Sequence, residues 1–495
     1  MQHEFFIPTH IYFGGGCLEK LGEIKLPGKK AMIVITPDAW IVDNGHLARL
    51  QRLLAKGGAE SVVYNKVHPN PGKRQVEEAA LLCRQENCDF VLGFGGGSSI
   101  DSAKSIALLA ANGGDFWDYI ATGSGAGKPI AKKPLPVIAV PTTAGTGTEA
   151  DPWVVVTKEE TNEKVGFGAP EMFPAVSFVD PELMVSVPPR LTAFQGFDAL
   201  FHAMEGYIAT VATPISDVFA LRSISLLGQN LVRVVQNGAD LQAREAVALA
   251  STCSGVVESL SNCTSNHSIA QAMGAYHDNL PHGAALLMIA NEYFSSFVDV
   301  IPERYARMAQ ALTGDPTATA DRLLPTLYEM EKACGVEALR MSDYGIGPEE
   351  LEVFCTNALE IAGELFEIEP RPITRERVME ILRRSSRGAT PAPGGCRAHD
   401  PQEGEQTEKS NRNTGKTGLF RVRRGDRGDP AGAAGRARTM CRGGERPAVD
   451  HDPRVGLFVH CHTPGADRVS RLAGLRPLRK GGAGPAGGET RIRRL

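Results

Sequence analysis

The stretch Phe90-Val91-Leu92-Gly93-Phe94-Gly95-Gly96-Gly97-Ser98-Ser99-Ile100-Asp101 decides the fold class of this chain. Its apolar first half predicts a buried strand, and helical spacing over residues 103–107 predicts that a helix follows. Ser98 and Asp101 have the spacing of a capping box. The glycines let the backbone approach a ligand closely, and a helix start favours a pyrophosphate. The pattern is neither GxGxxG nor GxxxxGK[ST], so it does not name the nucleotide.

Outward from this stretch, short apolar runs alternate with segments of helical spacing. We expect strands over 31–36, 61–64 and 136–140 and helices over 47–54 and 76–83. Continuous apolar strands separated by helices indicate a parallel sheet covered on both faces. From about Pro188 to Arg387 long helical segments dominate. The sequence therefore predicts an α/β dinucleotide-binding domain over 1–187, an all-helical domain over 188–387, and a cleft between them.

The charge pattern separates these domains from the C-terminal tail. Residues 388–495 contain 21 Lys and Arg against 11 Asp and Glu, whereas residues 1–387 contain 32 against 46. An acidic surface argues against nucleic-acid binding by residues 1–387. The tail carries 20 Gly and 9 Pro and no useful periodicity. We therefore expect residues 388–495 to form a disordered basic tail.

Cysteine usage and hydropathy indicate a cytoplasmic protein. The ten cysteines include no CxxC pair, which favours reduced thiols over a disulfide framework in a chain of 495 residues. No run approaches the length of a membrane-spanning helix, and the first residues lack the pattern of a signal peptide. We expect no membrane partner and keep a homo-oligomer open.

Two further groups of residues suit the binding of a ligand or a metal ion. The loop Pro141-Thr142-Thr143-Ala144-Gly145-Thr146 follows a strand, where small and hydroxyl residues suit a ligand. Asp198 and His202 lie one helical turn apart, and His267 and His282 follow later. One carboxylate and three imidazoles suit Fe²⁺, Zn²⁺ or a similar ion. Spacing does not bring the two regions together, so hydrogen-bonded core histidines stay open as an alternative.

Residues 5–387 resemble the iron-containing (group III) alcohol dehydrogenase family. The resemblance rests on motifs in the family's order: Gly95-Gly96-Gly97-Ser98 with Asp101 and Lys104, Pro141 to Thr146 with Glu149, Val179 to Tyr207, and His267 through Pro281-His282-Gly283. It implies a dinucleotide-binding domain followed by a helical domain that binds metal and substrate. The tail after Arg387 has no counterpart in the family.

The resemblance assigns roles residue by residue. The metal ligands it implies are Asp198, His202, His267 and His282, with Fe²⁺ favoured and Zn²⁺ as the alternative. The cofactor residues it implies are Gly96, Gly97, Ser98, Thr142, Thr143, Thr146, Asn70 and Lys164. Asp38 is expected to accept the ribose 2′-hydroxyl, which favours NAD and leaves NADP open. Many relatives have a second histidine four residues after the one that matches His267, and this chain has Gln271 there. We expect Gln271 to position substrate, with His277 as the alternative source of an imidazole.

The implied reaction is the interconversion of an alcohol and its aldehyde or ketone, with hydride transfer to and from a nicotinamide cofactor. A small alcohol or aldehyde is the expected substrate. Two alternatives stay open. One is a glycerol-dehydrogenase-like or dehydroquinate-synthase-like metal enzyme of the same fold, and the other is a non-enzymatic paralogue that acts as an assembly module.

Overall fold

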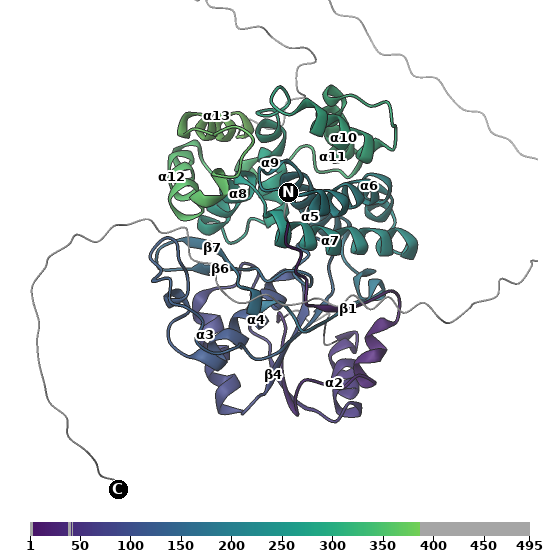
Figure 1. Ribbon diagram of the computed structural model, residues 1–495, viewed down its shortest axis with the longest axis vertical. Helices are drawn as coiled ribbons and strands as arrows, with labels where there is room; N and C mark the ends of the chain where they lie inside the picture. Colours follow the sequence, from purple (N-terminus) through teal and green to yellow (C-terminus); the bar gives the residue numbers. More distant parts are fainter. Residues whose placement is uncertain (1–2, 38–40, 42, 387–495) are drawn as a thin grey trace, which may run out of the picture. The chain divides into compact units, whose positions relative to one another are not determined.

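The computed structural model describes residues 3–37, 41 and 43–386 (Figure 1). All of these fall within a unit that runs from Met1 to Asp400. Asp38 and the predicted tail over 388–495 lie outside the described residues.

Six parallel strands form the main sheet, as the sequence predicts. Their order is β1 (His10–Phe13), β8 (Val176–Val179), β5 (Val137–Pro141), β4 (Phe90–Gly95), β2 (Lys30–Val34) and β3 (Glu60–Tyr64). The sequence pattern missed β1 and β8, because four residues are too few to show a period. The central strands β4 and β5 end beside each other, with Gly95 paired to Pro141. The two loops with candidate cofactor residues therefore start at the same edge of the sheet.

Helices cover both faces of this sheet. On β2, Met32 and Val34 pack with α3 (Lys73–Gln85) and α4 (Gly97–Asn112). Their neighbours Ala31 and Ile33 point the other way and pack with η1 (Cys17–Gly22) and α2 (His46–Lys56). Because successive side chains of a strand alternate between faces, a strand buried on both sides reads as a continuous apolar run.

A separate antiparallel hairpin, which the sequence analysis did not predict, is formed by β6 (Val154–Lys158) and β7 (Glu163–Phe167). Thr157 of β6 pairs with Lys164 of β7. The backbone N–H of Thr157 also donates to the carbonyl of Pro71 at 2.9 Å. The hairpin thus brings Lys164 next to the segment that carries Asn70.

Helices alone follow β8 in the described residues. They are α5 (Pro189–Ile208), α6 (Pro214–Gln236), α7 (Leu241–Ser261), α8 (Ser265–Tyr276), α9 (His282–Phe294), α10 (Pro302–Thr313), α11 (Leu323–Ala333), α12 (Leu351–Ile361) and α13 (Arg375–Ser385). Besides η1, the described residues contain the short 3₁₀ turns η2 (Phe116–Asp118), η3 (Pro170–Met172), η4 (Pro181–Met184), η5 (Ala320–Arg322), η6 (Met341–Tyr344), η7 (Pro348–Glu350) and η8 (Gly363–Phe366). Helices α5 to α13 share one apolar core, in which Phe201, Tyr207 and Tyr293 are fully buried. The domain boundary expected at 187/188 stays a prediction.

One described helix, α6, has the length and hydropathy to cross a membrane. Half of its most apolar window is buried inside the protein. It packs closely against α5, α7 and α10, as a core helix of a helical domain does. All seven cysteines in the described residues are free.

The predicted capping box at the start of α4 is wrong. The N-cap is Gly96, and no side chain caps the helix. Asp101 instead accepts hydrogen bonds from Oγ1 of Thr148 at 2.7 Å and from the backbone N–H of Val155 at 3.0 Å. A tertiary contact takes the carboxylate that the local motif would use. The first N–H groups of a helix lack partners one turn earlier, and the start of α4, with Gly97 and Ser98, lines a cavity of the site described next.

Candidate active site

A carboxylate and three imidazoles meet in the structure, from three different helices. Asp198 and His202 come from α5, His267 comes from α8, and His282 is the first residue of α9. Oδ1 of Asp198 lies 3.7 Å from Nδ1 of His202, 3.6 Å from Nε2 of His267 and 3.7 Å from Nε2 of His282. The helical spacing predicted the first pair, and the fold brings the other two histidines to it.

The atoms that face one another in this cluster lack hydrogen-bond partners among the described residues. They include Oδ1 of Asp198, Nδ1 of His202 and Nε2 of His267. Asp198, His202 and His267 are buried, and buried polar atoms are normally paired. Nitrogen and carboxylate oxygen donors of this kind suit Fe²⁺ or Zn²⁺. The residues therefore fit a divalent metal ion as the missing common partner.

The protonation states within the cluster differ from one side chain to the next. Burial and the neighbouring His267 lower the pKa of His202 to about 4. Burial also holds the pKa of His282 well below its ordinary value. Burial raises the pKa of Asp198, but the charges of the neighbouring imidazoles, that of His202 foremost, outweigh it and lower that pKa. Asp198 is thus a carboxylate, and the imidazoles of His202 and His282 are unprotonated, as metal ligands must be. Burial lowers the pKa of His267, but the charge of Glu205 and the contact with Asp198 outweigh it and raise that pKa to about 10, so His267 must release a proton when a metal binds.

Glu205 orients one of these imidazoles, a role that the sequence analysis missed. It is fully buried, and it lies 2.9 Å from Nδ1 of His267. It also accepts hydrogen bonds from the backbone N–H of Thr264 and from Nδ2 of Asn266, both at 2.9 Å. A carboxylate at Nδ1 leaves Nε2 of the imidazole free to bind a metal. The spacing i, i+4, i+7 of Asp198, His202 and Glu205 on one helix was an available signal.

Seven of the candidate cofactor residues line a larger cavity of about 530 Å³. Those that line it are Asn70, Gly96, Gly97, Ser98, Thr142, Thr143 and Thr146. The cavity reaches Asp198 and His282 at its other end. Asp38 lies outside the described residues, although Thr36 and Ile41 on either side of it line this cavity. The glycine-rich turn is tight, since a Cβ at Gly97 would lie 2.6 Å from Cγ2 of Thr146.

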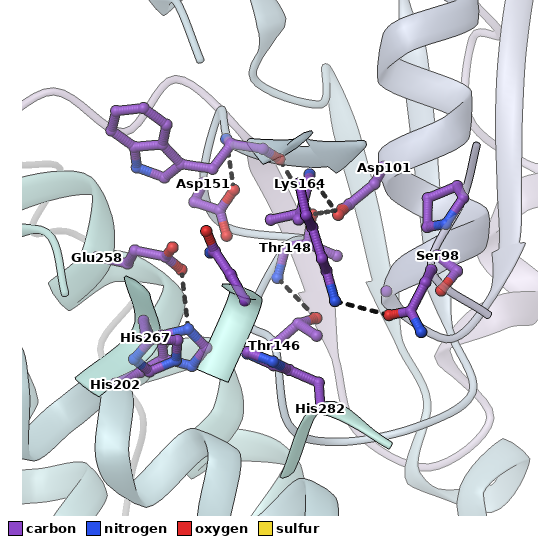
Figure 2. A pocket seen from close by; sticks show the side chains of 16 residues that line it. Ser98, Asp101, Thr146, Thr148, Asp151, Lys164, His202, Glu258, His267 and His282 are labelled. Carbon is purple, nitrogen blue, oxygen red and sulfur yellow. Dashed lines mark hydrogen bonds and ion pairs between the residues drawn. The ribbon is translucent and has the colours of Figure 1, made fainter. Parts of the chain in front are cut away.

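A smaller cavity of about 110 Å³ adjoins the first (Figure 2). Asn70, Gly97, Ser98, Thr146 and His282 line both. The smaller cavity is also lined by His202, His267, Lys164 and Gln271, and by residues that the sequence analysis did not single out as site residues, which are Pro71, Asp101, Thr148, Asp151, Trp153, Val155 and Glu258. The metal-ligand candidates thus lie where the two cavities meet.

Lys164 is a buried cation in the smaller cavity. Its Nζ donates to Oδ1 of Asn70 at 2.7 Å. Burial lowers the pKa of Lys164 to about 8, although the charges of Asp198 and Asp278 oppose that effect. Asn70 itself has a positive φ of 57°. This pair spans the hairpin and the α/β domain at the junction of the cavities.

A second buried lysine, Lys104, fixes one wall of the site. Nζ of Lys104, on α4, donates to Oγ1 of Thr148 at 2.8 Å and to Oδ1 of Asp151 at 3.0 Å. It also donates to the backbone carbonyl of Trp153 at 2.9 Å. These bonds tie the helix behind the glycine-rich turn to the loop that follows β5. Glu149 in the same loop accepts from Thr252 of α7 at 2.6 Å.

The structure places the two catalytic candidates, Gln271 on α8 and His277 directly after it, in different surroundings. Gln271 lines the smaller cavity and is only 6% exposed. His277, the residue after α8, lines neither cavity. Its Nε2 lies 2.8 Å from Oε2 of Glu350, and its ring packs edge-on against Phe354. The fold therefore places Gln271, and not His277, beside the metal-ligand candidates.

Comparison with known proteins assigns most of the described chain to one family. Residues 8–181 match the family described as iron-containing alcohol dehydrogenase, and residues 192–386 match the C-terminal part of the Fe-containing alcohol dehydrogenase family. The NAD-dependent methanol dehydrogenase of Bacillus methanolicus is 33% identical over 390 residues, which cover 77% of this chain and 98% of that protein.

Two solved structures show the same fold. An archaeal halo-thermophilic alcohol dehydrogenase from a Red Sea brine pool has a TM-score of 0.74 at 34% identity, covering 78% of this chain and 100% of that one. The sulfoacetaldehyde reductase of Bifidobacterium kashiwanohense, in complex with NAD⁺, has a TM-score of 0.69 at 28% identity, covering 78% and 99%.

Proposed function

Because this chain belongs to the iron-containing alcohol dehydrogenase family, we propose which of its residues bind the metal, the cofactor and the substrate in that family's reaction. The protein is an NAD-dependent oxidoreductase of the iron-containing type that interconverts an alcohol and its aldehyde. Hydride passes directly between the substrate carbon and the nicotinamide. The observation that carries our assignment of residues is the meeting of one carboxylate with three imidazoles at the junction of the two cavities.

One divalent ion is held by Asp198, His202, His267 and His282. Fe²⁺ is favoured by family membership, and Zn²⁺ suits the same donors. When bound, the ion supplies a Lewis acid that favours the alkoxide form of the alcohol and polarises the carbonyl in the reverse direction. The chain's own contribution is to keep His202 and His282 unprotonated by burial and to orient the ligands, as Glu205 does for His267.

NAD occupies the larger cavity. The start of α4, with Gly96, Gly97 and Ser98, binds the pyrophosphate through free backbone N–H groups and the helix dipole. Thr142, Thr143 and Thr146 bind the cofactor from the loop after β5. Asp38 accepts the ribose 2′-hydroxyl, which makes NAD the better cofactor than NADP.

The nicotinamide end of the cofactor meets the substrate where the two cavities join. Asn70 and Lys164 bind the cofactor there, and their mutual hydrogen bond fixes both side chains. Gln271 orients the substrate by hydrogen bonding and transfers no proton, because an amide does not ionise near neutral pH. The hydrogen bonds from Lys104 to Thr148 and Asp151 hold this side of the cavity in place. Hydride transfer needs such fixed positions of the reacting groups.

The substrate is a small alcohol or aldehyde, and we place the enzyme in the cytoplasm as a homo-oligomer. Free cysteines are typical of a reducing compartment and so support a cytoplasmic location. Exposed apolar side chains at Val211, Ile215 and Val218 support an interface with a second copy. The domains bind neither nucleic acid nor a membrane in this proposal.

The test uses the full chain, freed of metal with a chelator and then reloaded anaerobically with one equivalent of Fe²⁺ or Zn²⁺. NADH absorbance is followed with NAD and a series of short primary alcohols, and metal is measured in the same samples. We expect turnover that requires the ion and one bound ion per chain. Turnover that survives complete metal removal would contradict the assignment of the metal to the reaction.

The same assay separates the alternatives. Activity confined to glycerol would indicate a glycerol-dehydrogenase-like enzyme, and elimination of phosphate from a sugar-phosphate acid without net NADH would indicate a dehydroquinate-synthase-like one. A metal-loaded chain that binds NAD but turns over no alcohol or aldehyde would indicate an assembly module.

A further inference from the structure

The far end of the smaller cavity is polar. Trp153, Glu258 and Gln271 line this cavity and also line the next one, which contains none of the metal-ligand candidates and none of the glycine-rich turn. They come from three places in the fold: the residue before β6, helix α7 and helix α8. These three residues, which we call the distal polar group, therefore mark the end of the substrate cavity that lies away from the cofactor.

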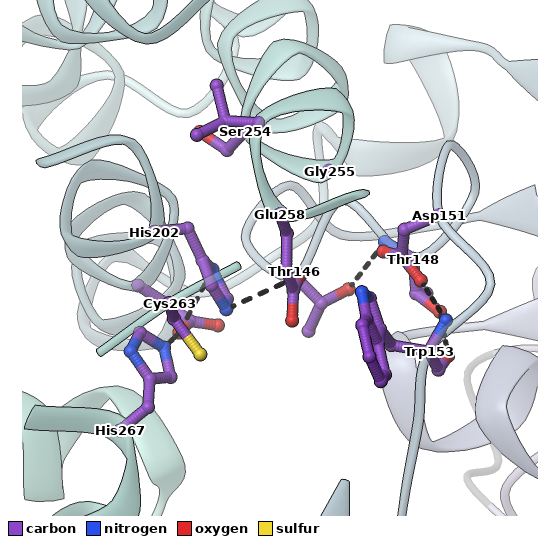
Figure 3. A network of polar contacts seen from close by, with 12 residues as sticks. Thr146, Thr148, Asp151, Trp153, His202, Ser254, Gly255, Glu258, Cys263 and His267 are labelled. Carbon is purple, nitrogen blue, oxygen red and sulfur yellow. Dashed lines mark hydrogen bonds and ion pairs between the residues drawn. The ribbon is translucent and has the colours of Figure 1, made fainter. Parts of the chain in front are cut away.

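The distal polar group lacks partners among the described residues. Gln271 is 94% buried, and its Oε1 accepts no hydrogen bond. Nε1 of Trp153 is buried and donates none. The only contact described for the Glu258 carboxylate is with Nε2 of His202 at 3.7 Å, beyond hydrogen-bond distance. Figure 3 shows the Glu258 side chain between the His202 ring and the Trp153 indole.

Other carboxylates of this cavity are already satisfied. Asp151 accepts from Nζ of Lys104 and from the backbone N–H of Trp153. Asp101 accepts from Thr148 and from the backbone N–H of Val155. Leaving a buried polar group unpaired costs about 1–3 kcal/mol. The distal polar group is thus the part of the cavity wall that gains most from a polar ligand.

The kinds of hydrogen-bonding groups identify that ligand. Trp153 offers only a donor, Glu258 offers acceptors, and Gln271 offers both. A hydroxyl accepts from an indole N–H and donates to a carboxylate or amide oxygen, so it satisfies donor and acceptor together. An ammonium group has only donors and leaves Nε1 of Trp153 unpaired. A methyl group leaves all three unpaired.

We propose that the substrate is a short alcohol with a second hydroxyl group, and that Trp153, Glu258 and Gln271 bind this second hydroxyl and so determine specificity. The inference rests on the proposed function, in which the first hydroxyl lies at the metal-ligand cluster. The cavity of about 110 Å³ limits the length of the substrate, since it equals the space of roughly four water molecules at about 30 Å³ each.

The experiment compares three alcohols of the same chain size that differ only in the terminal group. They are 1-butanol, 1,3-propanediol and 3-amino-1-propanol, each tested with the Fe²⁺-loaded full chain and NAD. We expect kcat/KM for the diol to exceed those for the other two by at least about tenfold, because a site built for a hydroxyl rejects analogues that lack it. Calorimetry of each alcohol with the Fe²⁺-loaded chain and NADH measures recognition independently of turnover.

Variants assign the preference to residues. Glu258→Leu and Trp153→Phe should each reduce the ratio of diol to butanol in kcat/KM by about tenfold, with one ion still bound per chain. Glu258→Gln, which keeps an acceptor, should restore most of the ratio. Glu245→Leu changes an exposed carboxylate of the same helix and should leave the ratio as it is in the parent protein.

Each other outcome overturns the inference in a recognisable way. Equal kcat/KM for butanol and the diol, or unchanged ratios in both variants, removes the distal polar group from specificity. A preference for the amino alcohol shows that the site binds a cation. Loss of the ion in Glu258→Leu shows that Glu258 is a metal ligand instead. Absence of turnover with all three alcohols contradicts the proposed function, and calorimetry then still decides which alcohol is bound.

Discussion

Glu205 lies 2.9 Å from Nδ1 of His267, and the opposite ring nitrogen of His267 faces the metal-ligand cluster without a partner among the described residues. The carboxylate accepts two further hydrogen bonds, from Thr264 and Asn266, so its own position is fixed. This contact connects the fully buried carboxylate of Glu205 to an imidazole that lines the smaller cavity. It sets which nitrogen of His267 is available to a metal.

Glu205→Gln should therefore weaken metal binding without removing it. An amide is a weaker acceptor and can turn its NH₂ toward Nδ1, which disturbs the tautomer of His267. We expect metal affinity to fall by about 10–100-fold, measured by competition with a calibrated chelator. Glu245→Gln, on an exposed face, is the matched control. Unchanged metal affinity in Glu205→Gln would show that the ring is oriented by other contacts.

His202→Ala should remove the ion and the activity together. Three of the four proposed ligands would remain, but His202 shares Asp198 with the others, and its loss opens the cluster to water. Metal content by elemental analysis should fall well below one ion per chain, while unfolding stays cooperative. His3→Ala, which changes an exposed histidine, is the control. Retention of one ion per chain by His202→Ala would refute the ligand set.

Gln271→His should keep kcat within about tenfold, roughly 1.4 kcal/mol in the activation barrier. The reason is that Gln271 positions substrate and exchanges no proton in our proposal. His277→Ala should also be mild, because the structure pairs His277 with Glu350 outside both cavities. A loss of several orders of magnitude in His277→Ala, with the ion still bound, would identify His277 as a proton relay.

Gly97→Ala should weaken cofactor binding. The new Cβ would lie 2.6 Å from Cγ2 of Thr146, so the two loops that line the larger cavity must separate. We expect KM for NAD to rise by about tenfold, with a smaller change in the melting temperature. Gly363→Ala adds a methyl group where no atom lies within 4 Å and serves as the control. Equal KM values for the two variants would place the cofactor elsewhere.

Glu331 should make stability depend on pH. Burial raises the pKa of Glu331 to about 8, although a hydrogen bond from Asn291 opposes the shift. Between about pH 4.5 and 8 the folded chain keeps a proton that the unfolded chain has lost, so the free energy of unfolding falls as pH rises, by a few kcal/mol in total. Glu331→Gln should therefore have the higher melting temperature at pH 8 and a similar one at pH 5. An equal difference at both pH values would contradict this linkage.

The sequence by itself determined the parts of this protein that local order controls. The stretch from Phe90 to Asp101 predicted a strand, a tight turn and a helix, because apolar side chains and glycines act on their own backbone. The same holds for Asp198 and His202, since helical geometry places residues four apart on one face. These predictions gave the parallel sheet and half of the candidate metal ligands. His267 and His282 were candidates from their residue type, but spacing could not bring them to this pair, and the family resemblance was what assigned them as ligands.

The tertiary structure decided what depends on distant segments. Asp101 has the spacing of a cap, yet it bonds to Thr148 because folding brings that loop against α4. Glu258 and Trp153 carry no motif, and they reach the substrate cavity only because α7 and the chain before β6 converge there. Hydrogen bonding and desolvation act over a few ångströms in space. Such contacts between residues far apart in the chain leave no periodic signal in the sequence, and so the part of the cavity for which we propose a role in specificity could be recognised only in the folded protein.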